Sequence, residues 1–137
     1  MWILYAFCSA FFAGITAILA KIGIKNIDSN LATAIRTIVI LIFSWLMVGI
    51  VGSFHTITEL SASTIVFLIL SGLATGASWL CYYRALQDGE ASIVVPIDKL
   101  SIVVTIVFSY FVLKEKLNKK SFLGLVLIIV GTLTLLI

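Results

Sequence analysis

Long apolar stretches separated by short polar ones dominate the pattern along this chain. Each stretch is close to the roughly 20 residues that a helix needs to cross the hydrocarbon core of a bilayer. The stretches are apolar on all sides and do not alternate apolar with polar positions, so they predict helices and not the strands of a membrane barrel. We predict five membrane-spanning helices, over residues 2–20, 31–51, 64–86, 93–113 and 121–137.

The composition indicates the same class of protein. Hydrophobic residues make up 62% of the 137 residues and charged residues only 11%, whereas a water-soluble domain has roughly 25% charged residues. The net charge of +3 does not indicate nucleic-acid binding, because the basic residues lie at the ends of apolar stretches and form no stripe with interleaved aromatics. We therefore expect an all-α integral membrane protein, one domain over residues 1–137, passing several times through the cell (plasma) membrane.

Two features argue against a secreted domain held together by disulfides. The first apolar stretch follows residue 1 without a positively charged region, so we expect a retained helix and not a cleaved secretory signal. Cys8 and Cys81 both fall inside apolar stretches, without the spacing of a metal or redox motif. We expect two buried free thiols.

Basic residues are shared almost equally between the two sides of the predicted membrane. The side of the N-terminus carries Lys114, Lys116, Lys119 and Lys120, and the opposite side carries Lys21, Lys25, Arg84 and, slightly inside the second span, Arg36. The positive-inside rule then favours neither orientation. One interpretation is dual topology, in which two oppositely inserted copies form an antiparallel homodimer with the inverted-repeat plan of many transporters. The other is that such small counts carry no information and one orientation prevails.

The fourth stretch contains the residues that are most unusual for a span. Pro96 removes a backbone donor and so predicts a break in the helix, and the ionisable Asp98 and Lys99 are costly to hold in lipid. Ser101 and Thr105 follow Asp98 at helical spacing, and we interpret this face as the polar lining of a solute pathway. The alternative is that both charges extend to a nearby membrane edge. Adjacent helical residues point about 100° apart, so we do not expect Asp98 and Lys99 to pair.

The third stretch combines small and aromatic residues on one face. Gly72 and Gly76 form a GxxxG pattern, which predicts close helix packing, and Trp79 and Tyr83 continue the face. We interpret the two aromatic residues as part of the pathway, bordering a cavity. For the tyrosine, an interfacial aromatic belt is an equal alternative.

Further candidate residues lie in the other stretches. Arg36 interrupts the second one, where it either binds an anionic group, pairs with Asp98, or extends to the membrane edge. Small residues in the first and last stretches, among them Gly14, Gly124 and Gly131, predict additional packing faces.

The second half of the chain also carries a connected set of motifs. YYRAL ends the third stretch, a loop of the form xGxAS follows, Pro96 lies in the fourth stretch, and VLKEKL and FLGxxLIxxG follow it. Together they resemble the EamA domain of the drug/metabolite transporter superfamily, while the first two stretches match only in general pattern. The resemblance implies one repeat of an inverted-repeat transporter. The small multidrug resistance transporters are similar in plan and assemble as antiparallel dimers, but they bind cations through a glutamate in their first helix, and this chain has no acidic residue there.

The resemblance implies a secondary or facilitative transporter, since EamA relatives are often exporters of amino acids and other metabolites. Arg36, Asp98 and Lys99 make the pathway neutral to positive, which favours amino-acid-like or other carboxylate-bearing solutes over cations. No Walker motif is present, so ATP is not expected as the direct energy source. We expect alternating access within a dimer, with Asp98 as the first choice for any proton coupling. The expected partners are a second copy of the chain, the bilayer and a small-molecule solute, with no nucleic acid, metal or cofactor.

Two other classes stay open. A non-transporting membrane subunit, or half of a heteromeric carrier, has the same hydropathy, and a flippase for lipid-linked substrates is a variant of the transporter. A membrane-embedded enzyme is not expected, because the chain has a single histidine, His55, and no nucleophile with a base at compatible spacing.

Overall fold

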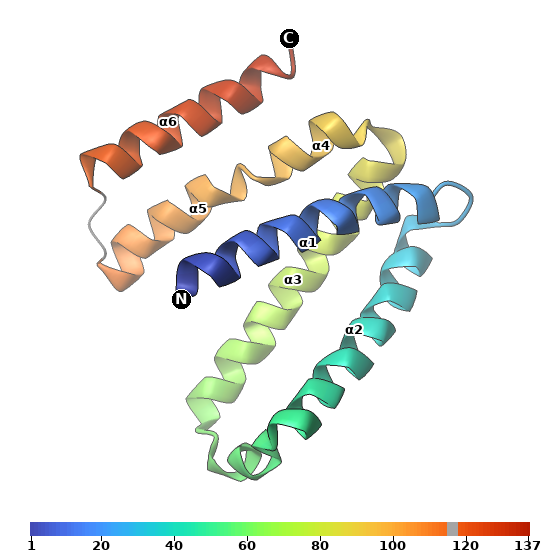
Figure 1. Cartoon of the computed structure of the whole chain (residues 1–137), viewed down its shortest axis with the longest axis vertical. Coiled ribbons are helices and arrows are strands. Elements are labelled where there is room, and N and C mark those ends of the chain that lie inside the picture. Colours follow the sequence, from blue (N-terminus) through green and yellow to red (C-terminus); the bar gives the residue numbers. More distant parts are fainter. Residues whose placement is uncertain (115–117) are drawn as a thin grey trace. The chain divides into compact units, whose positions relative to one another are not determined.

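The computed structural model describes residues 1–114 and 118–137, and these residues form helices without any strand. The α-helices are α1 (Trp2–Gly23), α2 (Ser29–Val51), α3 (Ala62–Asp88), α4 (Ala91–Asp98), α5 (Ser101–Phe108) and α6 (Lys119–Thr134) (Figure 1). A 3₁₀-helix, η1 (Ser53–Glu59), connects α2 to α3, and a π-helix, η2 (Ser109–Leu113), follows α5. Part of the VLKEKL motif, including Lys116, lies outside the described residues.

Four segments of the described chain are long and apolar enough to cross a membrane. They are α1, α2, α3 and the segment Ala91–Leu113, which contains α4, α5 and η2. These segments confirm an all-helical membrane protein and match the first four predicted spans to within a few residues. The fifth predicted span corresponds to α6, which has 16 residues, fewer than the roughly 20 that a spanning helix needs. A fifth crossing therefore stays a prediction.

The fourth predicted span is interrupted near its middle. Pro96 lies inside α4, and the interruption follows at Lys99 and Leu100. There the backbone bonds join residues three apart: Leu100 N donates to Ile97 O over 2.9 Å, and Val103 N donates to Leu100 O over 2.9 Å. Bonds of this kind tighten the chain into a 3₁₀-like turn, and within a longer helix such a turn is a common feature of hinges.

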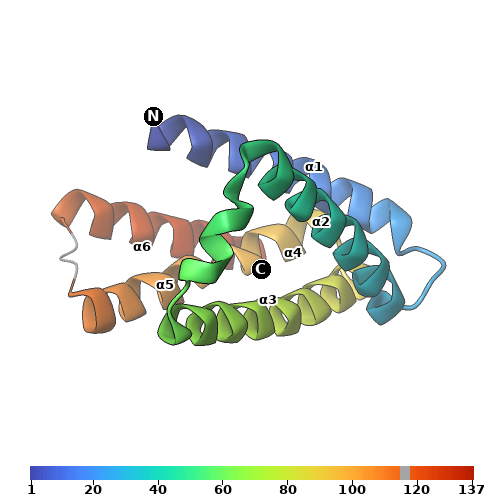
Figure 2. The same ribbon diagram turned by 90° about the horizontal axis from the view of Figure 1, so that it is seen from below.

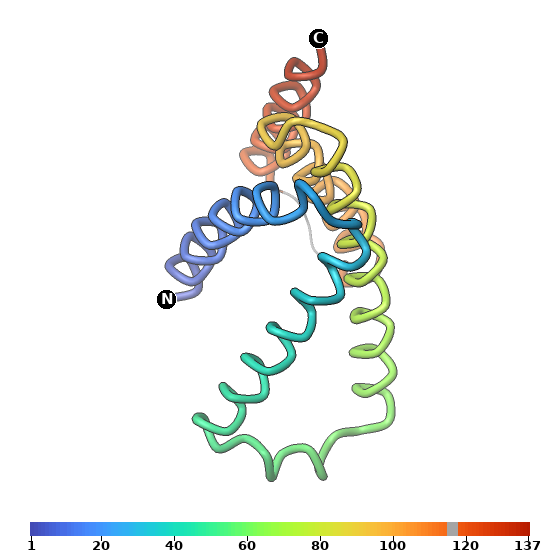
Figure 3. The backbone as a smooth tube through the Cα atoms, turned by 90° about the vertical axis from the view of Figure 1, so that its right-hand side faces the viewer, coloured from blue at the N-terminus to red at the C-terminus, as the bar shows by residue number. Residues whose placement is uncertain are grey.

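The chain divides into two compact units, Met1–Asp88 and Gly89–Ile137. In the first unit α2 and α3 run antiparallel; they lie closest near the α1–α2 loop and diverge toward η1, which connects their other ends (Figures 2 and 3). Helix α1 contacts α3. In the second unit α4 contacts α6, and the two run in opposite directions (Figure 1).

Buried side chains of the first unit gather at its α1–α2 loop end. Ala17, Ile24, Tyr83 and Leu86 are each no more than 3% exposed. Helix α2 begins next to this loop with a cap: the Asp28 carboxylate accepts hydrogen bonds from Asn30 N and Leu31 N. Such a cap stabilises a helix by about 1 kcal/mol.

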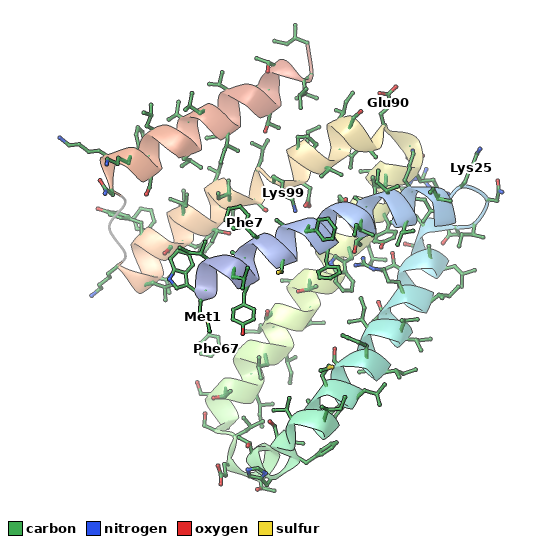
Figure 4. The ribbon with its side chains drawn as sticks, viewed as in Figure 1. Met1, Phe7, Lys25, Phe67, Glu90 and Lys99 are labelled. Atoms are coloured by element: carbon green, nitrogen blue, oxygen red, sulfur yellow. The ribbon has the colours of Figure 1, made fainter. Side chains whose placement is uncertain are left out.

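Most other large apolar side chains are exposed on the single chain, as Phe7 and Phe67 illustrate (Figure 4). Extensive apolar surface is what a protein shows when lipid or another protein covers it. Cys8 and Cys81 are free, but both are exposed, so the prediction that they are buried was wrong. Apolar character alone placed them inside, whereas the helices enclose side chains mainly near the α1–α2 loop.

Candidate functional site

A cavity of about 370 Å³ lies among α1, α2 and α3 in the first unit. Small residues on its walls leave this space open, because Ala20, Gly23 and Ala32 carry little or no side chain where bulkier residues would fill it. The remaining lining residues are Thr16, Leu19, Ile24, Ile27, Ile35, Arg36 and Tyr83. The wall is thus mainly apolar, with one hydroxyl from α1, one cation from α2 and one phenol from α3. We call this space the three-helix cavity.

Arg36 lies against two aromatic rings of α3. Its Cζ is 4.6 Å from the ring centroid of Trp79 and 5.3 Å from that of Tyr83. Cation–π contacts of this kind contribute roughly 0.5–2 kcal/mol and leave the positive charge in place. Arg36 is the eighth residue of α2, about 10 Å along the helix from its start. The guanidinium of the half-buried Arg36 therefore lies against α3, and whether it also reaches a membrane edge stays an open alternative.

The contact between Arg36, Trp79 and Tyr83 was not predicted, although all three had been assigned to the pathway. The sequence signal is the spacing of the two aromatic residues, since positions four apart lie on one helix face and together offer a broad ring surface. Nothing in the sequence says which helix supplies the cation. Arg36 and Asp98 belong to different units, and their pairing stays a prediction.

Tyr83 is only 2% exposed, and its hydroxyl has no hydrogen-bond partner within the part of the chain that the structure describes. Its ring meets that of Tyr82 edge to face, with centroids 5.9 Å apart. A buried hydroxyl without a partner costs roughly 1–3 kcal/mol. Tyr83 thus lines the cavity with its hydroxyl buried beside it, and the interfacial belt stays an alternative.

Hydrogen bonds join α1 and the α1–α2 loop to the end of α3, in the same region of the first unit as the three-helix cavity. Lys21 Nζ donates to Leu86 O and, over 3.5 Å, to Gln87 O, so the cation lies at the carbonyl end of α3 where it is electrostatically favoured. In return, Gln87 Nε2 donates to Ile24 O over 3.3 Å and to Ile27 O over 2.7 Å. These bonds tie the α1–α2 loop, in which Lys25 lies, to the end of α3 (Figure 4).

The second unit holds the other predicted pathway residues. Lys99 Nζ is 3.5 Å from Asp98 Oδ2 (Lys99 is labelled in Figure 4), so the expectation that these neighbours do not pair was wrong. The 100° separation applies within a regular helix, but α4 ends at Asp98, and the long lysine side chain reaches back from the turn. Thr105 Oγ1 donates to Ser101 O over 3.1 Å, and both residues are exposed. A solute-lining face built from these residues stays a prediction.

The candidate packing glycines do not contact other helices in the described structure. A Cβ placed at Gly14, Gly72, Gly76, Gly124 or Gly131 would meet no atom within 4 Å among the described residues. By contrast, a Cβ at Gly49 would lie 3.5 Å from the Phe54 ring. The five open glycines therefore leave flat helix faces within their units, and close packing there stays a prediction.

Comparison with known proteins finds one matching family and two similar proteins. The EamA-like transporter family matches residues 1–137. A Sinorhizobium protein described as an uncharacterized transporter in the cobO 3' region is 48% identical over 134 residues, which cover 98% of this chain and 95% of that protein. An uncharacterized protein of Methanocaldococcus jannaschii is 32% identical over 103 residues, covering 69% of this chain and 75% of the relative. No solved structure matches.

The family match and the four apolar spans support each other, because the match extends over all of the helices that carry the candidate residues. The similarity to the Sinorhizobium protein also extends over nearly the whole of both chains. This chain therefore belongs to the EamA-like transporter family and is a multi-pass protein of the cell membrane.

Proposed function

We propose that the chain is a secondary or facilitative transporter or exporter of small polar metabolites that carry a carboxylate, amino-acid-like solutes included. The observation that carries this proposal is the three-helix cavity, which holds the Arg36 cation within membrane-spanning helices. A cation is expensive inside a membrane protein and usually marks a path for ions or solutes. In this proposal the solute crosses the membrane without being chemically changed, and no enzymatic step is involved.

The interrupted fourth span supports transport through a second feature. Transporters place substrate and ion sites where a spanning helix is discontinuous, because the turn frees backbone groups and lets charged side chains face a cavity. Here the turn carries Asp98 and Lys99, paired at 3.5 Å. In our proposal Asp98 takes up a proton, which releases Lys99 from the pair and couples a pH gradient to the movement of an anionic solute.

We further propose that two copies work together as an antiparallel homodimer. The near-equal numbers of basic residues on the two sides support insertion in both orientations. The glycine faces that are open in the single chain support close contact with a second chain. Alternating access then follows from one protomer rocking against the other around a shared pathway.

Reconstitution into lipid vesicles tests transport and coupling together. With an imposed pH gradient, we expect the purified chain to accumulate a labelled carboxylate solute, and Asp98→Asn to abolish this accumulation while leaving passive exchange. Asp88→Asn is the matched control, because Asp88 is an exposed partner of Arg84 at a helix end and should transport normally. Unchanged gradient-driven transport by Asp98→Asn would rule out its coupling role. Failure of the wild-type chain to move any solute would favour a non-transporting subunit or half of a heteromeric carrier.

A topology measurement tests the homodimer. Two reporters that are active on opposite sides of the membrane are fused in turn after Ile137. We expect both to give signal, because a chain without a charge bias inserts both ways. Signal from a single reporter would contradict the antiparallel homodimer.

A further inference from the structure

Two hydrogen-bond donors of the three-helix cavity meet at one place and lack an acidic partner. The Arg36 guanidinium lies 5.3 Å from the Tyr83 ring centroid, and the Tyr83 hydroxyl is buried without a hydrogen-bond partner among the described residues. The residues that line the cavity include no carboxylate. A guanidinium and a phenol hydroxyl both donate hydrogen bonds, so together they fit an anionic group that accepts from both.

The rest of the cavity suits an apolar body. Its lining is mainly apolar, and Leu19, Ile24, Ile27 and Ile35 are its aliphatic residues with large side chains. Its volume of about 370 Å³ is in the range of small-molecule sites, roughly 300–1,000 Å³. A strongly polar solute would leave its own polar groups unpaired against these side chains, which is costly. A solute with one anionic group and an apolar remainder fits this lining: the anionic group matches Arg36, and the remainder matches the apolar side chains.

The aromatic contacts of Arg36 prepare it for this role. Rings hold the guanidinium through their faces and accept no conventional hydrogen bond, so its N–H groups at the ring edges stay available in a fixed orientation. Ligand binding therefore does not have to break an internal ion pair. The unpaired Tyr83 hydroxyl, which is costly in the empty cavity, becomes favourable when a ligand oxygen reaches it.

We propose that Arg36 and Tyr83 bind the carboxylate of an apolar organic acid whose hydrocarbon part fills the three-helix cavity. This narrows the solute class of the proposed function, on which it rests, from carboxylate-bearing metabolites in general to monocarboxylates with an apolar body. Arg36 supplies the charge and the fork of donors that a carboxylate accepts. Tyr83 supplies one further donor.

Direct binding to the purified full chain tests the site without requiring transport. The probes are 3-phenylpropionate, its neutral amide and 3-phenylpropylamine, which share one apolar body and differ in charge. By titration calorimetry in phosphatidylcholine nanodiscs, we expect saturable binding of the acid, binding of the amide about 10-fold weaker or more, and no saturable binding of the amine. Equal binding of acid and amine would overturn the proposal.

Variants assign the binding to the two residues. Arg36→Gln should weaken binding of the acid by about 10-fold or more and Tyr83→Phe by about 3- to 10-fold, as expected for a charge-assisted and an ordinary hydrogen bond. Arg84→Gln and Tyr5→Phe are matched controls that lie outside the cavity and should bind as the wild type does. If Arg36→Gln does not fold, Arg36→Lys is used instead, with a smaller loss expected because the charge remains and the fork is lost.

Stability of the empty protein separates a ligand site from a structural role. Tyr83→Phe removes an unpaired buried hydroxyl, so its unfolding temperature should not fall below that of the wild type. A lower unfolding temperature with unchanged affinity would show that the hydroxyl is structural and would overturn its assignment to a ligand.

The anionic group has a second source, the phosphate of a lipid. The titration is therefore repeated in nanodiscs that contain phosphatidylglycerol. Retained binding of the acid supports a soluble carboxylate, and complete loss of binding in anionic lipid assigns the site to a headgroup and overturns the proposal. Binding of the acid without its transport would leave this site standing and reject the proposed function. Transport of other solutes without binding of the acid would reject this site and leave the proposed transport function standing.

Discussion

The two ends of the first unit are built in different ways. At the α1–α2 loop end, side chains of α1 and α3 are buried, Lys21 joins α1 to the end of α3, and Gln87 joins the loop to it. At the η1 end, α2 and α3 diverge (Figure 3), and the aromatic pair Trp45 and Phe54 stacks on a surface that is largely exposed. The α1–α2 loop end is stabilised by contacts within the chain, whereas the η1 end exposes apolar side chains.

The comparison shows where the stability of such a unit comes from. In lipid, an apolar helix face gains little by leaving its surroundings, so helix association depends on close packing and on hydrogen bonds between helices. The loop end has both kinds of contact, and the three-helix cavity lies next to them. At the η1 end, the stacked rings of Trp45 and Phe54 join residues that are close in the sequence. We therefore expect substitutions at the loop end to affect the folded chain more than equivalent ones elsewhere.

The largest expected effect is that of Leu86→Ala. Leu86 is fully buried at the loop end, and its truncation should lower the free energy of unfolding by about 2 kcal/mol or more, because it leaves a cavity between packed helices. Leu73→Ala on the same helix is the control, since Leu73 is 66% exposed, and should change stability by about 0.5 kcal/mol or less. Unfolding in detergent micelles, followed by circular dichroism, measures both. Equal losses would mean that the two regions of α3 do not differ in packing.

A smaller loss is expected for Gln87→Ala. The substitution leaves Ile24 O and Ile27 O without their side-chain donor and should cost about 1–2 kcal/mol. It should also free the α1–α2 loop, so trypsin should cleave after the exposed Lys25 faster than in the wild type.

Thr58→Val is the control for that experiment, because it removes a hydrogen bond to His55 O near the η1 end. Its cleavage after Lys25 should match the wild type. If both variants expose Lys25 equally, the loop is not held by Gln87, and the two ends are more alike than their hydrogen bonds indicate.

Much of the secondary structure could be predicted from the sequence, because a long apolar run indicates a membrane-spanning helix. The first predicted span, residues 2–20, corresponds to α1 at Trp2–Gly23, and the second, residues 31–51, corresponds to α2 at Ser29–Val51. The interruption of the fourth span was predicted from Pro96, and it occurs a few residues further on. The final helix was predicted two to three residues too far along the chain, over 121–137, because hydropathy continues to residue 137 although α6 is Lys119–Thr134.

Contacts between helices could not be predicted in the same way. Arg36, Trp79 and Tyr83 were recognised as unusual residues, but their contact depends on how α2 rotates relative to α3, which hydropathy does not specify. The pairing of Asp98 with Lys99 depends on a local departure from helical geometry. Lys21 was counted only as a charge at the membrane edge and Gln87 was not singled out, because their partners are backbone carbonyls, which every residue carries. A lysine at the end of one span and a glutamine at the end of another are the weak signal that was present.

The smallest effect is expected at the η1 end, for Phe54→Ala. The Phe54 ring stacks on Trp45 with centroids 5.9 Å apart and an interplanar angle of 13°, and α2 brings Gly49 beside it. Removing the ring should cost about 0.5–1 kcal/mol in micelles, the usual contribution of an aromatic pair, because detergent covers the surface that it leaves. A loss larger than that of Leu86→Ala would reverse the comparison between the two ends. A loss that appears only in bilayers, where two copies can meet, would instead show that a second chain contacts this end.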